Sequence, residues 1–203
     1  MEIEAVIFDM DGVLCELDDV ARLGYLSRLS GRTPQEIHRA IWGSGFEDLS
    51  DSGQITADEY LKGFGDRIGY PLTELEWIGY RKAGTRPILQ SIGVAESLSA
   101  RCQLSLLTNN GLMLKRTMDA VFPHMHQIFG SKIYVSAEFK DTKPNKFIYL
   151  KACEAIGCHP AKTLMIDDRL ENVIGAQEAG LQGYRYIDWS ELIEELRSRS
   201  LVD

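Results

Sequence analysis

Two aspartates separated by one residue, Asp9 and Asp11, are the side chains of this sequence best placed to do chemistry. They follow the apolar run Ala5-Val6-Ile7-Phe8 and precede Gly12, where a short buried strand is predicted to meet a turn. In open α/β sheets, ligands bind at the carboxyl ends of the strands. At such a position one aspartate can attack a phosphoryl group while the other moves a proton, beside a bound cation. The structural alternative is a turn built from Asp and Gly.

Three other predicted strands also end in polar residues. A hydroxyl and amides at a helix amino terminus suit phosphate oxygens, and a lysine just before a helix can neutralise a phosphate. Two adjacent acids repel each other unless a cation lies near them. Because the carboxyl ends of parallel strands share one edge, these groups are expected to lie close to Asp9. They are Thr108-Asn109 after the strand 104–107, Lys143 after the strand 133–135, and Asp167-Asp168 after the strand 163–166.

The donor types predict which metal this edge would bind. Asp167 and Asp168, together with Asp9, offer oxygen ligands without a His or Cys partner, which favours Mg²⁺ over zinc or copper. His124 and His126 lie in a predicted Pro-containing loop with no third ligand nearby. The cysteines lack CxxC spacing, so neither a zinc site nor a disulfide framework is indicated; they are Cys15, Cys102, Cys153 and Cys158.

The elements that must position these residues alternate between helix and strand from residue 87 onward. Such alternation predicts an α/β fold, a Rossmann-like parallel sheet flanked by helices and connected by right-handed crossovers. The predicted helices span 87–101, 112–121, 145–156, 171–179 and 190–199, and the strands between them span 104–107, 133–135, 163–166 and 183–187.

Between the first strand and this alternating region, the sequence is predicted to be helical. Capping boxes begin at Thr33, Thr56 and Thr73, and Asp18-Asp19 opens a helical stretch that runs to Ser30. The region therefore indicates about four helices and no strand. The predicted division is an α/β core of residues 1–15 and 85–203, with an all-helical cap of residues 16–84 inserted after the first strand. Residues 18–22 and 84–86 are the candidate hinges.

Composition narrows the classes of partner. The 203 residues carry a net charge of −8 with a pI near 5.1, which argues against a nucleic-acid surface. No apolar run approaches the length of a membrane span. Residues 1–4 lack the basic flank and apolar core of a signal peptide, so a cytoplasmic protein is expected. The sequence does not indicate an oligomeric state.

The four segments, in this order, resemble the four motifs of the haloacid dehalogenase superfamily of phosphohydrolases. The similarity covers about residues 3–14 and 86–188. The later run Glu171-Asn172-Val173 with Gly175-Ala176 is also similar to this superfamily. The four segments that carry the resemblance are Asp9-Met10-Asp11-Gly12-Val13, Leu107-Thr108-Asn109, Lys143-Pro144 and Ile166-Asp167-Asp168.

The resemblance implies a role for each matching residue. Asp9 would form an aspartyl-phosphate, and Asp11 would protonate the leaving oxygen and later activate water. Thr108 and Lys143 would hold the transferring phosphoryl group, with a further hydrogen bond from Asn109. Mg²⁺ would be bound by the Asp9 carboxylate, the Asp11 backbone carbonyl and Asp168, with Asp167 helping directly or through water and Asn172 bracing the metal loop.

The helical insert resembles the small caps of sugar-phosphate phosphatases in this superfamily, so the expected substrate is a small phosphorylated metabolite. A phosphomutase of the same fold and a catalytically silent binding module are the alternatives. Trp42 and Phe46, in a glycine-containing loop, are candidates for reading the substrate, although both residue types more often pack a helical core. Arg169 and Asn145 depart from the family pattern and leave the charge of the pocket open.

Overall fold

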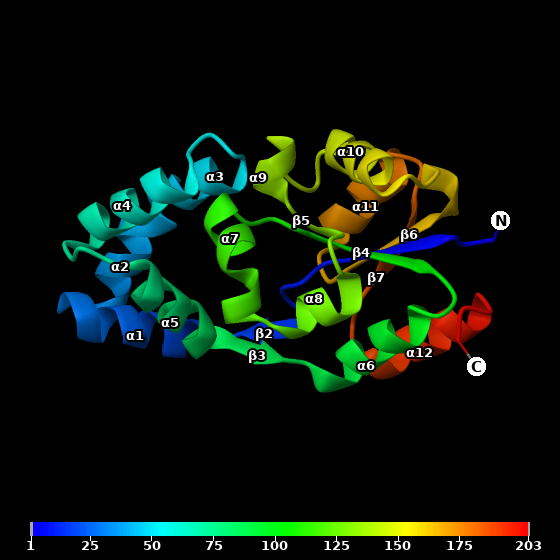
Figure 1. Cartoon of the computed structure of the whole chain (residues 1–203), viewed down its shortest axis with the longest axis horizontal. Helices are drawn as coiled ribbons and strands as arrows, with labels where there is room; N and C mark the ends of the chain where they lie inside the picture. The colour runs from blue at the N-terminus through cyan, green and yellow to red at the C-terminus, as the bar shows by residue number, and fades with distance from the viewer. Residues whose placement is uncertain (1, 203) are drawn as a thin grey trace.

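The computed structural model describes residues 2–202; residues 1 and 203 of the predicted core lie outside this range. Five parallel strands form one sheet in the order β5-β4-β1-β6-β7, which confirms the α/β fold (Figure 1). The strand that precedes Asp9 is therefore the central one, with a hydrogen-bonded neighbour on each side. The strands are β1 (Ala5–Phe8), β4 (Gln103–Thr108), β5 (Ile133–Val135), β6 (Thr163–Asp167) and β7 (Gln182–Arg185).

Helices cover both faces of the sheet, as a continuous apolar strand requires. All four residues of β1 are fully buried. Ala5 and Ile7 join one apolar cluster, while Val6 and Phe8 join the other, because successive side chains point to opposite faces. In Figure 1, α10 (Lys146–Ile156) and α11 (Leu170–Glu178) lie above the sheet, and α6 (Leu89–Leu98) and α12 (Trp189–Ser198) lie below it.

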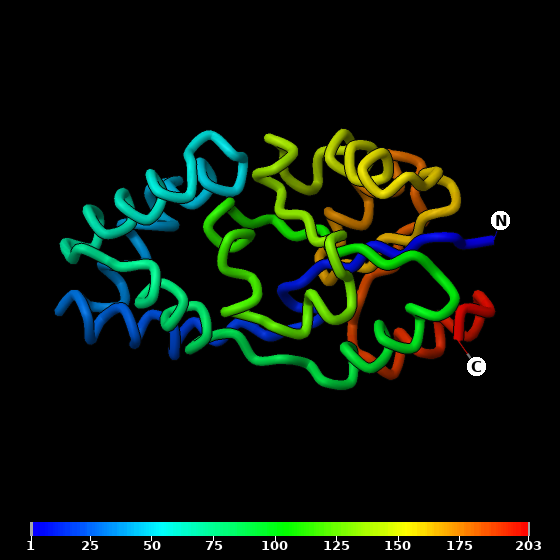
Figure 2. Tube along the Cα trace, in the orientation of Figure 1, coloured from blue at the N-terminus to red at the C-terminus, as the bar shows by residue number. Residues whose placement is uncertain are grey.

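Residues 19–84 form a helical cap to one side of the sheet, and Figure 2 follows the chain out through it and back. Thr33, Thr56 and Thr73 each make both bonds of the predicted capping box. The prediction of about four helices was short by one, because α3 begins at a glycine with no side-chain cap. The cap helices are α1 (Asp19–Ser30), α2 (Pro34–Ile41), α3 (Phe46–Asp51), α4 (Ala57–Ile68) and α5 (Glu74–Gly84).

A short antiparallel ribbon connects the cap to the sheet. Its strands are β2 (Cys15–Leu17) and β3 (Thr85–Pro87). Residues 18–22 were expected to be a hinge strand or an adjacent loop, but residues 19–22 form the start of α1, because Oδ1 of Asp18 accepts a hydrogen bond from the Ala21 N–H and caps the helix. The predicted hinge at 84–86 overlaps β3. The division at residues 15/16 and 84/85 falls at this ribbon and stays a prediction.

Two short helices replace predicted loop. His124 and His126 belong to α8 (His124–Phe129), which buries Met125 and Phe129 beneath the sheet and places Phe129 against Phe8. The second short helix is α9 (Ser136–Phe139), which was not predicted. Helix α7 (Leu112–Val121) has the predicted bounds. None of the helices within residues 2–202 is both long enough and apolar enough to cross a membrane. A cytoplasmic location stays a prediction.

Candidate active site

A cavity of about 330 Å³ opens at the carboxyl edge of β1, β4 and β6. Because β1 pairs in parallel with both neighbours, Phe8 lies beside Leu106 and Ile166, and the residues that follow each strand emerge together. This brings segments far apart in the sequence to one place. The predicted site residues that line the cavity are Asp9, Asp11, Thr108, Asn109, Lys143 and Asp168.

A buried lysine bridges two of the acids. Nζ of Lys143 lies 2.9 Å from Oδ1 of Asp9 and 2.6 Å from Oδ2 of Asp167, and all three side chains are at least nine-tenths buried. Burial raises the pKa of Asp9 to about 7, although the charge of Lys143 opposes this. Burial alone would lower the pKa of Lys143, but the two carboxylates raise it. The lysine is therefore held in its charged form at the floor of the cavity.

Asp167 lies behind the cavity wall, where several donors occupy both of its oxygens. Nδ2 of Asn172 donates to Oδ1 and Oδ2 at 3.0 and 3.1 Å, and the Arg169 N–H donates to Oδ1 at 3.0 Å. Tyr149 in turn donates to the Asn172 carbonyl at 2.7 Å. With Lys143 also bound, Asp167 is placed to orient the lysine, and Asn172 braces this loop as expected.

Asp168 has unused capacity to bind a cation. Among the residues that the structure describes, nothing donates to its buried Oδ1. One carboxylate oxygen each from Asp9, Asp167 and Asp168 lies within 4.8 Å of the others. Gly12 has a φ of +85°, and a Cβ there would lie 2.6 Å from the Asp168 carboxyl carbon, so glycine is required where Asp168 approaches. These residues fit a hard cation with oxygen ligands.

Asp11 faces different partners from Asp9. Oδ2 of Asp11 accepts from Nδ2 of Asn110 at 3.3 Å, and Oδ1 lies 3.4 Å from the Cys15 thiol. Asp9 instead accepts from the Met10 N–H and contacts Lys143. The two acids therefore occupy separate environments, as a division into nucleophile and proton carrier requires.

Asn110 belongs to the polar segment predicted after the strand 104–107, but sequence reasoning assigned it no role of its own. Its Nδ2 donates to Oγ1 of Thr108 at 2.8 Å as well as to Asp11. Asn109 is used differently: its Nδ2 donates to the Lys143 carbonyl at 2.8 Å, and its Oδ1 accepts from the Lys143 N–H at 2.9 Å. Its side chain therefore holds the lysine loop.

The cap meets the sheet edge next to this cavity. Oγ of Ser136 donates to the Asp51 carbonyl of α3 at 2.7 Å and accepts from the Asn110 N–H at 3.1 Å. Gly53, just after α3, has a φ of +66° and comes so close to the Ala137 carbonyl that a Cβ would collide with it. The end of α3 is thus seated on α9, and Ser136 of α9 connects it to Asn110.

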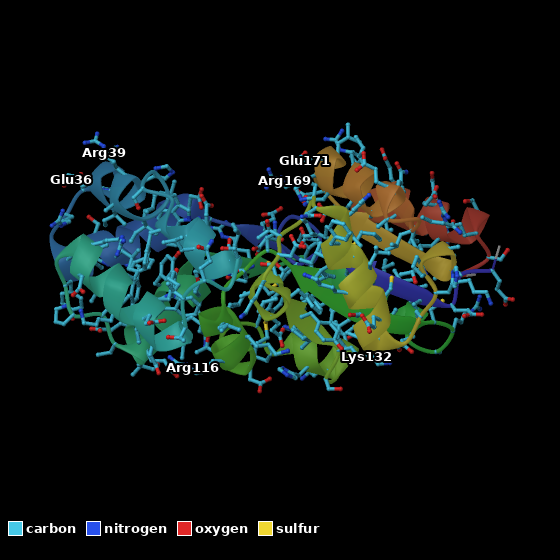
Figure 3. All side chains as sticks on the ribbon, turned by 90° about the horizontal axis from the view of Figure 1, so that it is seen from above. Glu36, Arg39, Arg116, Lys132, Arg169 and Glu171 are labelled. Atoms are coloured by element: carbon cyan, nitrogen blue, oxygen red, sulfur yellow. The ribbon has the colours of Figure 1, made fainter. Side chains whose placement is uncertain are left out.

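Arg116 of α7 makes two ion pairs to the cap, at 2.6 Å with Asp58 and at 2.9 Å with Glu74. Figure 3 shows it where the cap helices meet α7. These pairs are largely exposed, so each contributes little to stability. They add to the contacts that seat the cap over the sheet edge.

The two departures from the family pattern have different surroundings. Arg169 lines the cavity, and its exposed side chain pairs with Glu171 at 2.6 Å (Figure 3). Asn145 caps α10 by accepting a hydrogen bond from the Phe147 N–H at 3.1 Å. Arg169 therefore lies at the rim as half of an ion pair with Glu171, and Asn145 has a local structural role.

The candidate substrate-reading loop contributes to the core of the cap. Phe46 is 4% exposed and stacks on Tyr60 with ring centroids 5.5 Å apart and planes 5° apart. Trp42 packs edge-on against Phe64 and under the guanidinium of Arg22. Their positions favour packing over contact with a ligand.

Phe46→Ala is expected to lower the free energy of unfolding by about 3–5 kcal/mol, because it removes a buried aromatic ring from the cap core. Leu49→Ala, an exposed change on the same short helix, is the matched control and should cost less than about 1 kcal/mol. Urea denaturation measures both. Equal stabilities, together with a changed substrate preference in Phe46→Ala, would restore the substrate-reading role.

Comparison with known proteins agrees with this geometry. The family model of haloacid dehalogenase-like hydrolases matches residues 3–180. A phosphatase of Mycobacterium tuberculosis is 25% identical over 91% of this chain and 87% of its own length. The D-ribitol-5-phosphate phosphatase of Bacteroides thetaiotaomicron is 24% identical over 96% and 97% of the two chains.

A solved structure also has this fold. It is a haloacid dehalogenase family enzyme of Bacteroides thetaiotaomicron in complex with magnesium and inorganic phosphate. The two chains superpose with a TM-score of 0.77 at 24% identity, over 94% of this chain and 98% of the other. The arrangement of sheet and helical cap is thus shared over nearly the whole length of both.

Proposed function

Because the chain belongs to the haloacid dehalogenase-like hydrolase family, we propose that it hydrolyses small phosphomonoesters of the phosphorylated-sugar type through an aspartyl-phosphate on Asp9. The observation that carries the proposal is the buried Lys143 between Asp9 and Asp167, beside the donor-free Oδ1 of Asp168. Similarity to a D-ribitol-5-phosphate phosphatase supports the substrate class.

In the first step, Asp9 attacks phosphorus and the bond between phosphorus and the leaving oxygen breaks. We assign the attack to Oδ2 of Asp9, because Lys143 and the Met10 N–H both contact Oδ1. Asp11 donates its proton to the leaving oxygen, a contribution that is typically about 10²–10⁴-fold. Thr108, the Asn109 N–H and Lys143 hold the phosphoryl oxygens.

In the second step, the Asp11 carboxylate takes a proton from water, the water oxygen attacks phosphorus, and the bond to Asp9 breaks to release phosphate. Asp9, the Asp11 carbonyl and Asp168 would hold Mg²⁺, which offsets the repulsion between the Asp9 carboxylate and a phosphate dianion. Asp167 and Asn172 keep Lys143 in place through both steps.

The test is phosphate release from a set of sugar phosphates with and without Mg²⁺, measured colorimetrically. We expect activity with Mg²⁺, a loss of at least about 100-fold in EDTA, and recovery when Mg²⁺ is restored. Full activity in EDTA would contradict the metal assignment. Isomerised ester without free phosphate would identify a phosphomutase, and binding of esters without turnover would identify a binding module.

A further inference from the structure

Three residues on one face of α5 have buried polar atoms that lack partners. Trp77, Tyr80 and Arg81 are spaced i, i+3 and i+4, so they project from the same side of the helix. Their exposed fractions are 2%, 0% and 5%. Within residues 2–202, Nε1 of Trp77, the hydroxyl of Tyr80, and Nε and Nη2 of Arg81 have no hydrogen-bond partner. Buried donors are nearly always paired, so this face lacks an acceptor.

The end of α5 lies beside the cavity, because Thr85 pairs with Leu17, which lines the cavity, and Oγ1 of Thr85 donates to the Arg81 carbonyl at 2.8 Å. Arg81 is in the last turn of α5, four residues before β3 begins the return to the sheet. Burial alone would lower the pKa of Arg81, but Asp11 raises it more than any other neighbour does. Burial raises the pKa of the Cys15 thiol, and the charge of Arg81 partly offsets this. The same thiol contacts Asp11. Groups beside Asp11 face the leaving alcohol, because Asp11 protonates its oxygen.

Two cap carboxylates share this environment. Glu47 and Asp51, at opposite ends of α3, both interact with the charge of Arg81. Oε2 of Glu47 accepts a hydrogen bond from the Tyr60 hydroxyl at 2.9 Å. Burial raises the pKa of both acids, that of Asp51 to about 8, so this part of the cap combines donors on α5 with carboxyl groups on α3 that can donate as well as accept.

The charge balance decides what kind of leaving group fits. The Nε–Nη2 edge of Arg81 offers two parallel N–H donors, which match either a carboxylate or neighbouring hydroxyl oxygens. Burial raises the pKa values of Glu47 and Asp51 here, that of Asp51 to about 8, even though the charge of Arg81 opposes this, so the same surroundings would disfavour the charged form of a further carboxylate. Hydroxyl groups can accept from Arg81 and donate to these acids at the same time.

We propose that Arg81, with Tyr80 and Trp77, binds the hydroxyl oxygens of a polyhydroxylated leaving group and determines the specificity of the reaction. This role rests on the proposed phosphomonoesterase function and identifies the residues that select its substrate. The unpaired donors of α5 are then satisfied only when such a substrate is bound.

Two four-carbon esters, erythritol 4-phosphate and butyl phosphate, provide the test. Both leaving alcohols need a proton from Asp11, but only erythritol has further hydroxyls. We expect the wild type to prefer the polyol ester, and Arg81→Gln to lower its kcat/KM by about 10- to 100-fold. The kcat/KM for butyl phosphate should stay within about threefold. Arg39→Gln, an exposed change on α2 (Figure 3), should alter neither value.

Binding separates this role from turnover. In the Asp9→Asn background, calorimetry should show preference for the polyol ester, and Arg81→Gln should remove it. That result supports binding of hydroxyl groups by Arg81 even if the wild type releases no phosphate. In that case the proposed phosphomonoesterase function fails, but the binding role does not. Arg81→Lys keeps the buried charge but loses the paired donors, so it repeats the test if Arg81→Gln is unstable.

Three results would overturn the proposal. Equal losses on both esters would show that Arg81 acts through Asp11 or the fold. No change on either ester would show that the α5 donors hold only water. A preference for 4-phosphooxybutanoate that disappears in Arg81→Gln would replace hydroxyls with a carboxylate as the recognised group.

Discussion

Asp9→Asn is expected to lower phosphate release by about 10³-fold or more, because an amide cannot form the aspartyl-phosphate. The change is nearly isosteric, and Lys143 keeps its contact with Asp167. Substrate binding should therefore survive while turnover is lost. Asp66→Asn, on the exposed side of α4, is the control and should retain full activity. Wild-type turnover in Asp9→Asn would show that another residue is the nucleophile.

The same variant should be at least as stable as the wild type above neutral pH. Burial raises the pKa of Asp9 from 3.8 to about 7, so the native state holds this proton more tightly than the unfolded chain does. The stability that Asp9 contributes is complete below pH 3.8 and is lost as the pH rises through 7. Asparagine does not titrate, so melting temperatures in EDTA should increasingly favour the variant between pH 4 and pH 7. A variant that melts below the wild type at pH 8 would contradict this.

Lys143→Met is expected to cost about 3–5 kcal/mol of unfolding free energy and nearly all activity. The change removes the charge between Asp9 and Asp167 and leaves two buried carboxylates facing each other. Burial raises the pKa of Asp9, and the charge of Lys143 no longer opposes this, so Asp9 favours its protonated form and the loss should be larger at pH 8 than at pH 5. Urea denaturation at the two pH values measures it.

Lys146→Met is the matched control, since Lys146 lies only three residues further on and is exposed. It should change the free energy of unfolding by less than about 0.5 kcal/mol. If Lys143→Met lost no more stability than Lys146→Met, the bridging ion pairs would be energetically unimportant. Retained activity in Lys143→Met would also exclude the lysine from phosphate binding.

The sheet and its reactive edge could be predicted from sequence because their signals are local. The apolar run of β1 and the adjacent acids of Asp167-Asp168 each mark a strand end without reference to other residues. The parallel arrangement then requires the ends to converge. Helix α7 and strand β5 have the predicted bounds, and the three threonine capping boxes are formed as expected.

What sequence could not predict depends on contacts across the fold. Asn109 was expected to face a phosphate, but its side chain binds the backbone of Lys143, thirty-four residues away. Phe46 sits in a glycine-containing segment that suggests a loop, yet Tyr60 stacks on it from another helix. The isolation of the Arg81 donors is visible only after the cap has closed around them.

The central position of β1 also governs when the site can assemble. β1 is synthesised before both of its hydrogen-bonded neighbours, which begin at residues 103 and 163. A nascent chain released before residue 163 would leave one side of this fully apolar strand unpaired, which is a template for aggregation. Its long-range pairing places β1 among the slower-forming parts of the fold, whereas the cap helices depend on local contacts. Asp9 therefore leaves the ribosome well before the strands that complete its surroundings.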